Sequence, residues 1–155
     1  WLEAPMDDTL LEQHSVLRSE LGQTILPAGY SIYSADFIRR AVEQHSWDAG
    51  RFDVTVIGGV STALELMIIA NEAGLPIEIQ SWGHALGQAA NLHLMLANEH
   101  TSYFEAPMPM EAFEFGMKNV IPLKQGRVFA PKGPGLGIEV DWENLDRADF
   151  YVRSE

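Results

Sequence analysis

Residues 52–74 read FDVTVIGGVSTALELMIIANEAG, and this stretch decides the fold because it joins a strand pattern to a helix pattern. The β-branched and apolar residues over 52–57 predict a buried strand. After Gly59, with Ser61 expected as the N-cap, apolar residues at helical spacing predict a helix that Gly74 ends. The unit is a strand followed directly by a helix.

The same unit recurs along the chain. Further strands are predicted over 1–4, 24–28, 76–79 and 103–106. Further helices are predicted over about 7–22, with Asp7, Asp8 or Thr9 as the N-cap, from residue 34, and over about 84–97. Such alternation predicts a parallel sheet, because each helical crossover returns the chain in the same direction. We therefore expect an α/β fold, either a barrel or an open sheet. A Pro- and Gly-rich extended tail over 107–137 follows it.

Composition limits the classes of protein. The 155 residues, 46% of them apolar and 21% charged, are typical of a soluble globular domain. The sequence has no cysteine and no apolar run long enough to span a membrane, so we expect no membrane partner and a cytoplasmic location. A net charge of -12 argues against nucleic acid as a partner. The chain starts inside a strand pattern, and unpaired strand edges predict a homo-oligomer.

Polar residues mark the predicted strands at or near their ends. They are Glu3, Tyr30 after Gly29, Asp53, Gln80 and Glu105. One acidic residue at a strand end is usually a solvated loop residue or a helix cap. Three acidic residues in five successive units instead predict one shared site, because the carboxyl ends of parallel strands converge. Glu-Ala-Pro-Met occurs at both 3–6 and 105–108. This repetition is what we expect where two strands end in equivalent ways.

Five segments together carry a family resemblance: WLEAP at 1–5, DVTVIGGVS at 53–61, AANLHL at 89–94, FEAP at 104–107 and PKGPGLG at 131–137. In this order, the sequence resembles the C-terminal barrel segment of the enolase superfamily, in particular its mandelate racemase and acid-sugar dehydratase branch. The resemblance implies that residues 1–155 form part of a TIM-type (β/α) barrel, about strands four to eight. It also implies that the capping domain and the first three strands are absent.

The resemblance implies a reaction as well. A base removes the proton alpha to the carboxylate of a hydroxy acid or acid sugar, and Mg²⁺ stabilises the resulting enediolate, giving dehydration or racemisation. Glu3 matches a metal ligand, and Glu105 matches an acid that donates a hydrogen bond to the substrate carboxylate. Asp53 matches the residue that orients a catalytic histidine. The expected partner is a small-molecule carboxylate.

Two positions depart from the family pattern. Tyr30 stands where the family has a carboxylate ligand, and a neutral phenol is a poor ligand for Mg²⁺. Gln80 stands where the branch has its catalytic histidine, and an amide has no basic form. Asp53 then either tunes the charge of the site or takes the proton itself. Tyr30 and Trp82 are the expected substrate-binding residues, and His84 is expected to be an exposed loop residue.

Three functions remain open from the sequence. The first is a lyase or racemase acting on a hydroxy acid. The second is a catalytically impaired relative that binds a ligand or supports an assembly, which the residues at Tyr30 and Gln80 suggest. The third is an open nucleotide-binding sheet with an anion-binding loop at 57–62, although its glycines fall short of a dinucleotide fingerprint.

Overall fold

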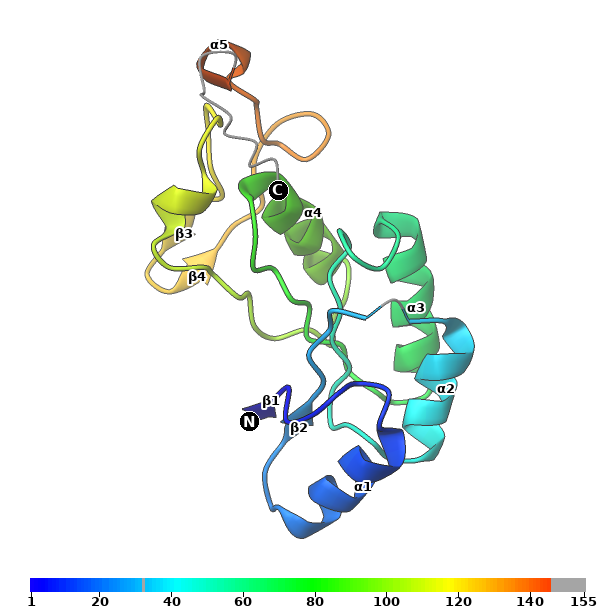
Figure 1. Ribbon diagram of the computed structural model, residues 1–155. Coiled ribbons are helices and arrows are strands. Elements are labelled where there is room, and N and C mark those ends of the chain that lie inside the picture. The colour runs from blue at the N-terminus through cyan, green and yellow to red at the C-terminus, as the bar shows by residue number, and fades with distance from the viewer. Residues whose placement is uncertain (32, 146–155) are drawn as a thin grey trace, which may run out of the picture.

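A computed structural model describes residues 1–31 and 33–145 of the chain (Figure 1). The helices are α1 (Leu11–Glu20), α2 (Ala35–Glu43), α3 (Val60–Glu72), α4 (Ala85–Leu96), the 3-10 turn η1 (Met110–Phe113) and α5 (Trp142–Leu145). The strands are β1 (Leu2–Glu3), β2 (Ile25–Leu26), β3 (Leu123–Lys124) and β4 (Arg127–Val128). The helices α1 to α4 lie where the apolar spacing predicts them.

Five segments follow one another in chain order, and the backbone pairing found among the first four of them is parallel. β1 pairs with β2 in parallel, with Leu2 opposite Ile25. The backbone N–H of Asp48 donates to the carbonyl oxygen of Ile25 at 3.0 Å, and three backbone hydrogen bonds of 2.8–3.1 Å join residues 50–52 to residues 76–80. The hydroxyl of Thr101, just before the fifth segment, donates to the carbonyl oxygen of Ile77 at 2.8 Å. With helices crossing between the segments, the chain forms a partial TIM-type barrel.

Successive side chains of these segments point to opposite faces. Phe52 and Ile79 are buried in the main core, with residues of α2 and α3. These two helices pack against each other on one side of the molecule (Figure 1). The neighbouring Arg51, Asp53 and Gln80 therefore point to the other face, the interior side of the barrel. This alternation brings charged and polar side chains together at the strand ends.

The strand predicted over 52–57 is wrong in its bounds. Parallel pairing comes earlier, at residues 50–52, and residues 54–58 form a turn. The Asp53 carbonyl oxygen accepts hydrogen bonds from two backbone N–H groups of this turn, and its carboxylate accepts a third from Thr55 N. These bonds bend the chain despite its β-branched residues. As a result, Asp53 stands at the end of a strand and not inside one.

Helix starts were predicted with mixed success. Ser34 caps α2 as the sequence indicates, because its hydroxyl accepts a hydrogen bond from Phe37 N at 3.1 Å. The cap predicted at Ser61 is wrong, since Gly59, with φ of 99°, is the N-cap of α3. The cap predicted among residues 7–9 is also wrong, and Leu10 occupies that position of α1. There the Asp7 carboxylate closes a local turn with Thr9 instead.

The tail folds back over α4, as its composition predicts. Ala89 and Leu92 of α4 pack with Ile121 in a second core, which Leu136 and Ile138 adjoin. The tail is not simply extended, because it contains η1 and the antiparallel β3–β4 hairpin, and α5 follows it. Among the helices of the described residues, none combines the length and the apolar character needed to cross a membrane.

Candidate functional site

A buried arginine lies between the two glutamates at the strand ends. The Arg51 side chain is 4% exposed, and its Nη2 is 2.9 Å from Glu105 Oε1 and 3.5 Å from Glu3 Oε1. The three residues come from the first, third and fifth parallel segments, and alternate strands of a barrel share one interior layer. We call these three residues the Arg51 cluster. Glu3 and Glu105 were predicted from the sequence, but Arg51 was not. The feature that could have indicated Arg51 is an isolated basic residue two positions before Asp53.

Glu105 is held by a second neighbour. Its Oε2 accepts a hydrogen bond from Ser81 N at 3.1 Å, and the Ser81 hydroxyl donates to the Glu105 carbonyl oxygen at 2.6 Å. Both carboxylate oxygens thus face donors, one from Ser81 and one from Arg51. Glu105 therefore accepts hydrogen bonds from the protein itself, and the family resemblance implies that it also donates one to a substrate carboxylate.

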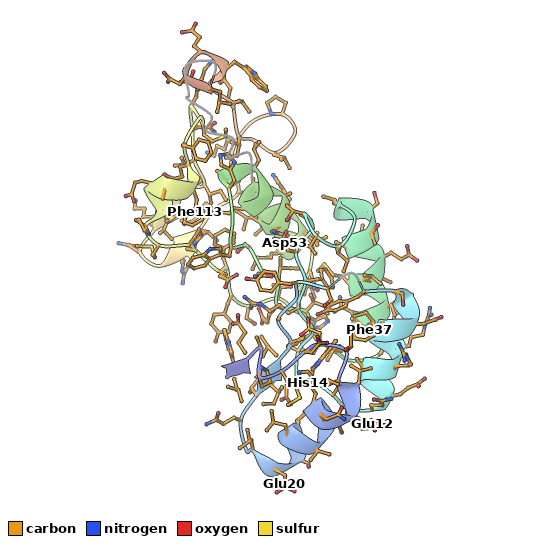
Figure 2. The ribbon with its side chains drawn as sticks, viewed as in Figure 1. Glu12, His14, Glu20, Phe37, Asp53 and Phe113 are labelled. Atoms are coloured by element: carbon orange, nitrogen blue, oxygen red, sulfur yellow. The ribbon has the colours of Figure 1, made fainter. Side chains whose placement is uncertain are left out.

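Asp53, labelled in Figure 2, is buried, and the hydrogen bonds to its carboxylate reach one of its two oxygens. Its Oδ1 accepts hydrogen bonds from Thr55 N at 2.8 Å and from Asn91 Nδ2 at 2.9 Å. Asn91, on α4, is itself fixed because its Oδ1 accepts from Val54 N at 3.0 Å. Within the described part of the chain, no protein group donates to Asp53 Oδ2. One oxygen is therefore positioned by the fold and the other remains available.

A cavity of about 250 Å³ adjoins Asp53. Ser81, Trp82 and Asn91 line it together with Asp53, so two of the predicted site residues meet there. The exposed Trp82 ring packs edge-on against Phe113 of η1, with 5.7 Å between ring centroids. The tail thus supports one wall of the cavity, which the sequence alone did not indicate.

His84 also lines this cavity, but both of its ring nitrogens are engaged. Nδ1 accepts a long hydrogen bond from Leu86 N at 3.5 Å as the N-cap of α4, and Nε2 donates to the carbonyl oxygen of Phe115 at 2.9 Å. The expectation of an exposed loop histidine is wrong, because His84 is half-buried and joins α4 to the tail. His14 is buried on α1 and His93 is half-buried on α4, as their helical positions predict.

Tyr30 and Gln80 lie outside the Arg51 cluster. They follow the second and fourth segments, whose side chains belong to the other set of barrel layers. Gln80 is buried, whereas Tyr30 is 65% exposed. In residues 1–31 and 33–145, neither side chain forms a hydrogen bond or ion pair with Arg51. The structure thus joins Glu3 to Glu105 through Arg51, and it places Asp53 and Trp82 at one cavity, whereas Tyr30 and Gln80 belong to neither group.

The residues of this chain do not fit a Mg²⁺ site. Mg²⁺ requires several oxygen ligands, with carboxylates supplying the charge. Glu3 offers one carboxylate, Tyr30 offers only an exposed phenol, and the guanidinium of Arg51 lies at Glu3 where a metal would bind. In the part of the chain that the structure describes, no three His, Cys, Asp or Glu side chains are grouped to hold a metal ion.

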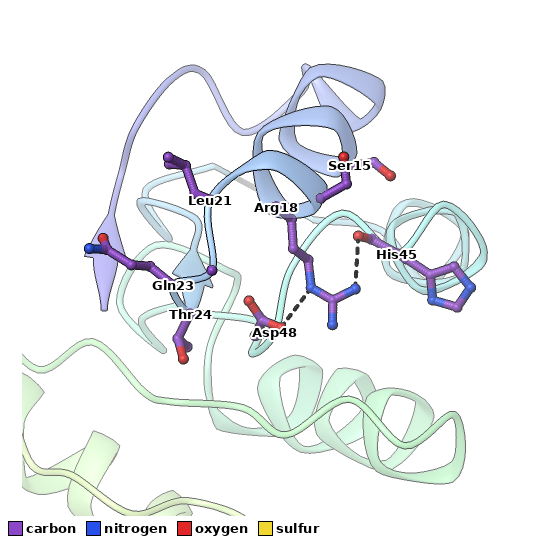
Figure 3. A pocket seen from close by; sticks show the side chains of 9 residues that line it. Ser15, Arg18, Leu21, Gln23, Thr24, His45 and Asp48 are labelled. Carbon is purple, nitrogen blue, oxygen red and sulfur yellow. Dashed lines mark hydrogen bonds and ion pairs between the residues drawn. The ribbon is translucent and has the colours of Figure 1, made fainter.

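A larger cavity, of about 510 Å³, lies at the other end of the strands (Figure 3). Thr24 and Asp48, which line it, precede their strands, whereas Asp53 follows its own. Arg18 of α1 crosses this cavity, with Nε 2.6 Å from Asp48 Oδ1 and Nη1 donating to the His45 carbonyl oxygen. In barrels this end serves stability, so we place the functional site at the Asp53 end.

Comparison with known proteins identifies chains that are similar to this one. The 3,6-anhydro-alpha-L-galactonate cycloisomerase of Streptomyces coelicolor is 30% identical over 95% of this chain and 38% of its own length. A crystal structure from Pseudovibrio sp., assigned to the mandelate racemase/muconate lactonizing enzymes, is 37% identical with a TM-score of 0.91. The match covers 97% of this chain and 41% of the Pseudovibrio chain.

A racemase from Streptomyces coelicolor A3(2), solved with bound magnesium, is 25% identical with a TM-score of 0.79, over 95% of this chain and 38% of its own. The chain thus spans about two fifths of the length of these relatives. The family model described as enolase C-terminal domain-like matches residues 1–144. An open nucleotide-binding sheet is therefore wrong for this chain, and the family resemblance is confirmed. The chain belongs to the enolase C-terminal domain-like family, in the mandelate racemase branch of the enolase superfamily.

Proposed function

We propose that the protein removes the proton alpha to the carboxylate of a small hydroxy acid or acid sugar. The observation that carries this proposal is that Asp53, whose Oδ2 is available, and the buried cation Arg51 lie two residues apart at one strand end. A base and a positive charge at one place are what the abstraction of such a proton needs. The relatives named above as a cycloisomerase and a racemase support the general class of reaction.

In the proposed reaction, Asp53 Oδ2 takes the alpha proton and the C–H electron pair moves into the substrate carboxylate. The product of this step is an enediolate with two negative charges, so a fixed positive charge nearby lowers the barrier. Protonation of the alpha carbon by solvent water from the opposite face, with Asp53 releasing its proton to solvent, gives racemisation. Transfer of the proton from Asp53 to a beta-hydroxyl group, which then leaves as water, gives dehydration.

The other predicted site residues have supporting roles in this proposal. Trp82 lines the cavity beside Asp53 and offers its ring to the substrate. Tyr30 lies at the exit of β2, where its phenol can contact a bound molecule, and Gln80 supplies a buried amide on the interior face. Glu3 and Glu105 fix Arg51 through their ion pairs. In this scheme, no step passes through a metal ion held by this chain.

The test follows deuterium incorporation at the alpha carbon by NMR. Full-length protein is incubated in deuterated water with a panel of hydroxy acids and acid sugars. We expect exchange with at least one member, and Asp53→Asn lowers its rate by about 10²- to 10⁴-fold because the general base is lost. Asp36→Asn is the matched control, because Asp36 is paired with Arg39 on the exposed surface of α2.

The contradicting outcome is the absence of exchange and of dehydration across the panel, or full exchange in Asp53→Asn. The second function, a relative that binds without turnover, is suggested by the residues at Tyr30 and Gln80. It predicts ligand binding without exchange. The double variant Tyr30→Glu/Gln80→His stays inactive if the protein is a binder, whereas recovered turnover identifies an enzyme that lost its activity recently.

A further inference from the structure

We infer that Arg51, which lies between Glu3 and Glu105, is the resident cation of this site and takes the place of a divalent metal at Glu3. The protein would then bind a carboxylate ligand without Mg²⁺. The identity of the ligand, a small carboxylate, rests on the proposed function. The position of the cation does not. The position comes from the two ion pairs of Arg51.

The charge of Arg51 is permanent. A guanidinium does not lose its proton in proteins, so its positive charge persists even though the side chain is 4% exposed. Two carboxylates at 2.9 and 3.5 Å compensate that charge. A metal ion bound to Glu3 would stand beside this fixed charge, and repulsion between like charges at such distances is strong in a buried place.

Arg51 also keeps donor capacity for a ligand. Both of its ion pairs use Nη2. Its Nε is buried and has no hydrogen-bond partner among the described residues. A guanidinium presents several donors in a rigid plane, which suits a carboxylate held by two oxygens. The guanidinium of Arg51 therefore has N–H donors that its two ion pairs do not use.

The backbone of the neighbouring strand exit holds the arginine in place. Gly29 has φ of 79°, and a Cβ there would lie 3.0 Å from Arg51 Cγ. Gly29 itself is fixed, because its N–H donates to Asp8 Oδ2 at 3.2 Å. The stem of Arg51 is thus packed against a backbone that cannot easily move. A metal ion could displace the guanidinium only by rotating the outer bonds of this side chain, because its stem is held.

The test measures Mn²⁺ binding to full-length protein by electron paramagnetic resonance and calorimetry. For the wild type we expect no Mn²⁺ site that depends on Glu3. In Arg51→Met the two carboxylates lose their counter-ion, so the affinity for Mn²⁺ rises by about tenfold or more. Lys118→Met is the matched control: it removes the exposed partner of Glu139, 2.6 Å away, and should leave Mn²⁺ affinity unchanged.

A second variant keeps the test decisive if Arg51→Met does not fold. Arg51→Lys retains the positive charge and is expected to exclude Mn²⁺ as the wild type does. The inference is overturned if the wild type binds one Mn²⁺ that Glu3→Gln abolishes, or if Arg51→Met gains no affinity while folded. Neither result depends on turnover. The Mn²⁺ measurement therefore tests the role of Arg51, and the deuterium exchange separately tests the proposed function. Exchange that persists in a chelator adds support.

Discussion

The buried carboxylate of Asp8 fixes the backbone that follows β2, next to the Arg51 cluster. It accepts hydrogen bonds from Ala28 N at 2.7 Å, from Gly29 N at 3.2 Å and from the Tyr33 hydroxyl at 2.7 Å. These bonds fix the exit of β2, whose Gly29 backbone packs against Arg51. Burial, together with the negative charge of Asp8, raises the pKa of Tyr33 well above its usual value.

We predict that Tyr33→Phe lowers the free energy of unfolding by about 1–3 kcal/mol at neutral pH, since Asp8 loses a donor. The effect depends on pH in a defined direction. The pKa of Tyr33 is raised in the folded state, so above about pH 10 the unfolded chain loses this proton first and wild-type stability falls. The difference between wild type and Tyr33→Phe therefore shrinks above that pH.

Urea denaturation between neutral pH and about pH 10.5 measures this difference. Tyr103→Phe is the control, because Tyr103 is exposed and its hydroxyl makes no hydrogen bond in the described part of the chain. A difference that stays constant or grows with pH would contradict the proposed role of Tyr33.

At the same scale, the sequence could predict the acids of the site but not their partners. Glu3 and Glu105 were recognisable because each precedes the same Ala-Pro turn. Arg51, Ser81 and Asn91 were missed, although they contact Glu105 or Asp53 directly. The spacing of residues along one strand does not show which residues of other strands lie in the same barrel layer. The three-dimensional arrangement of the strands determines these contacts.

Among the elements, helices were more predictable than strands. α1 to α4 each contain 9–13 residues, long enough for the helical period to be read. The paired strands β1 and β2 contain two residues each, so alternation has little room to appear. At 52–57 the β-branched residues favoured a strand, but the backbone and side-chain hydrogen bonds of Asp53 produced a turn.

One close contact between neighbouring segments gives a prediction at this scale. A Cβ at Gly50 would lie 2.6 Å from Ile77 Cδ1, so Gly50→Ala must push the two segments apart or move a buried side chain. We expect it to lower the free energy of unfolding by about 1–3 kcal/mol. Gly22→Ala is the matched control, because a Cβ there meets open space and its φ is ordinary.

For Gly22→Ala we expect a neutral effect or a gain of up to about 1 kcal/mol, since alanine restricts the unfolded chain. Chemical denaturation of the two variants side by side measures the contrast. Equal stabilities for Gly50→Ala and Gly22→Ala would contradict the close packing of residues 50–52 against residues 76–80.

In the whole molecule, the first and fifth segments approach each other through side chains. The rings of Trp1 and Tyr103 lie 5.1 Å apart between centroids, and both are exposed. Their backbones form no hydrogen bonds with one another in the residues that the structure describes. We predict that residues 1–155 on their own associate, because unpaired parallel edges and exposed rings promote contact between copies. Sedimentation velocity measures this, and a fully folded monomer would contradict it.

The account as a whole rests on a cation supplied by the protein at the strand ends. The most direct measurement is a crystal structure of the full-length protein grown with Mn²⁺ and a carboxylate ligand, with anomalous data collected for manganese. We predict no anomalous peak between Glu3 and Glu105, and the guanidinium of Arg51 within ion-pair distance of both. A manganese ion bound to Glu3, with Arg51 turned away from the two glutamates, would contradict the account.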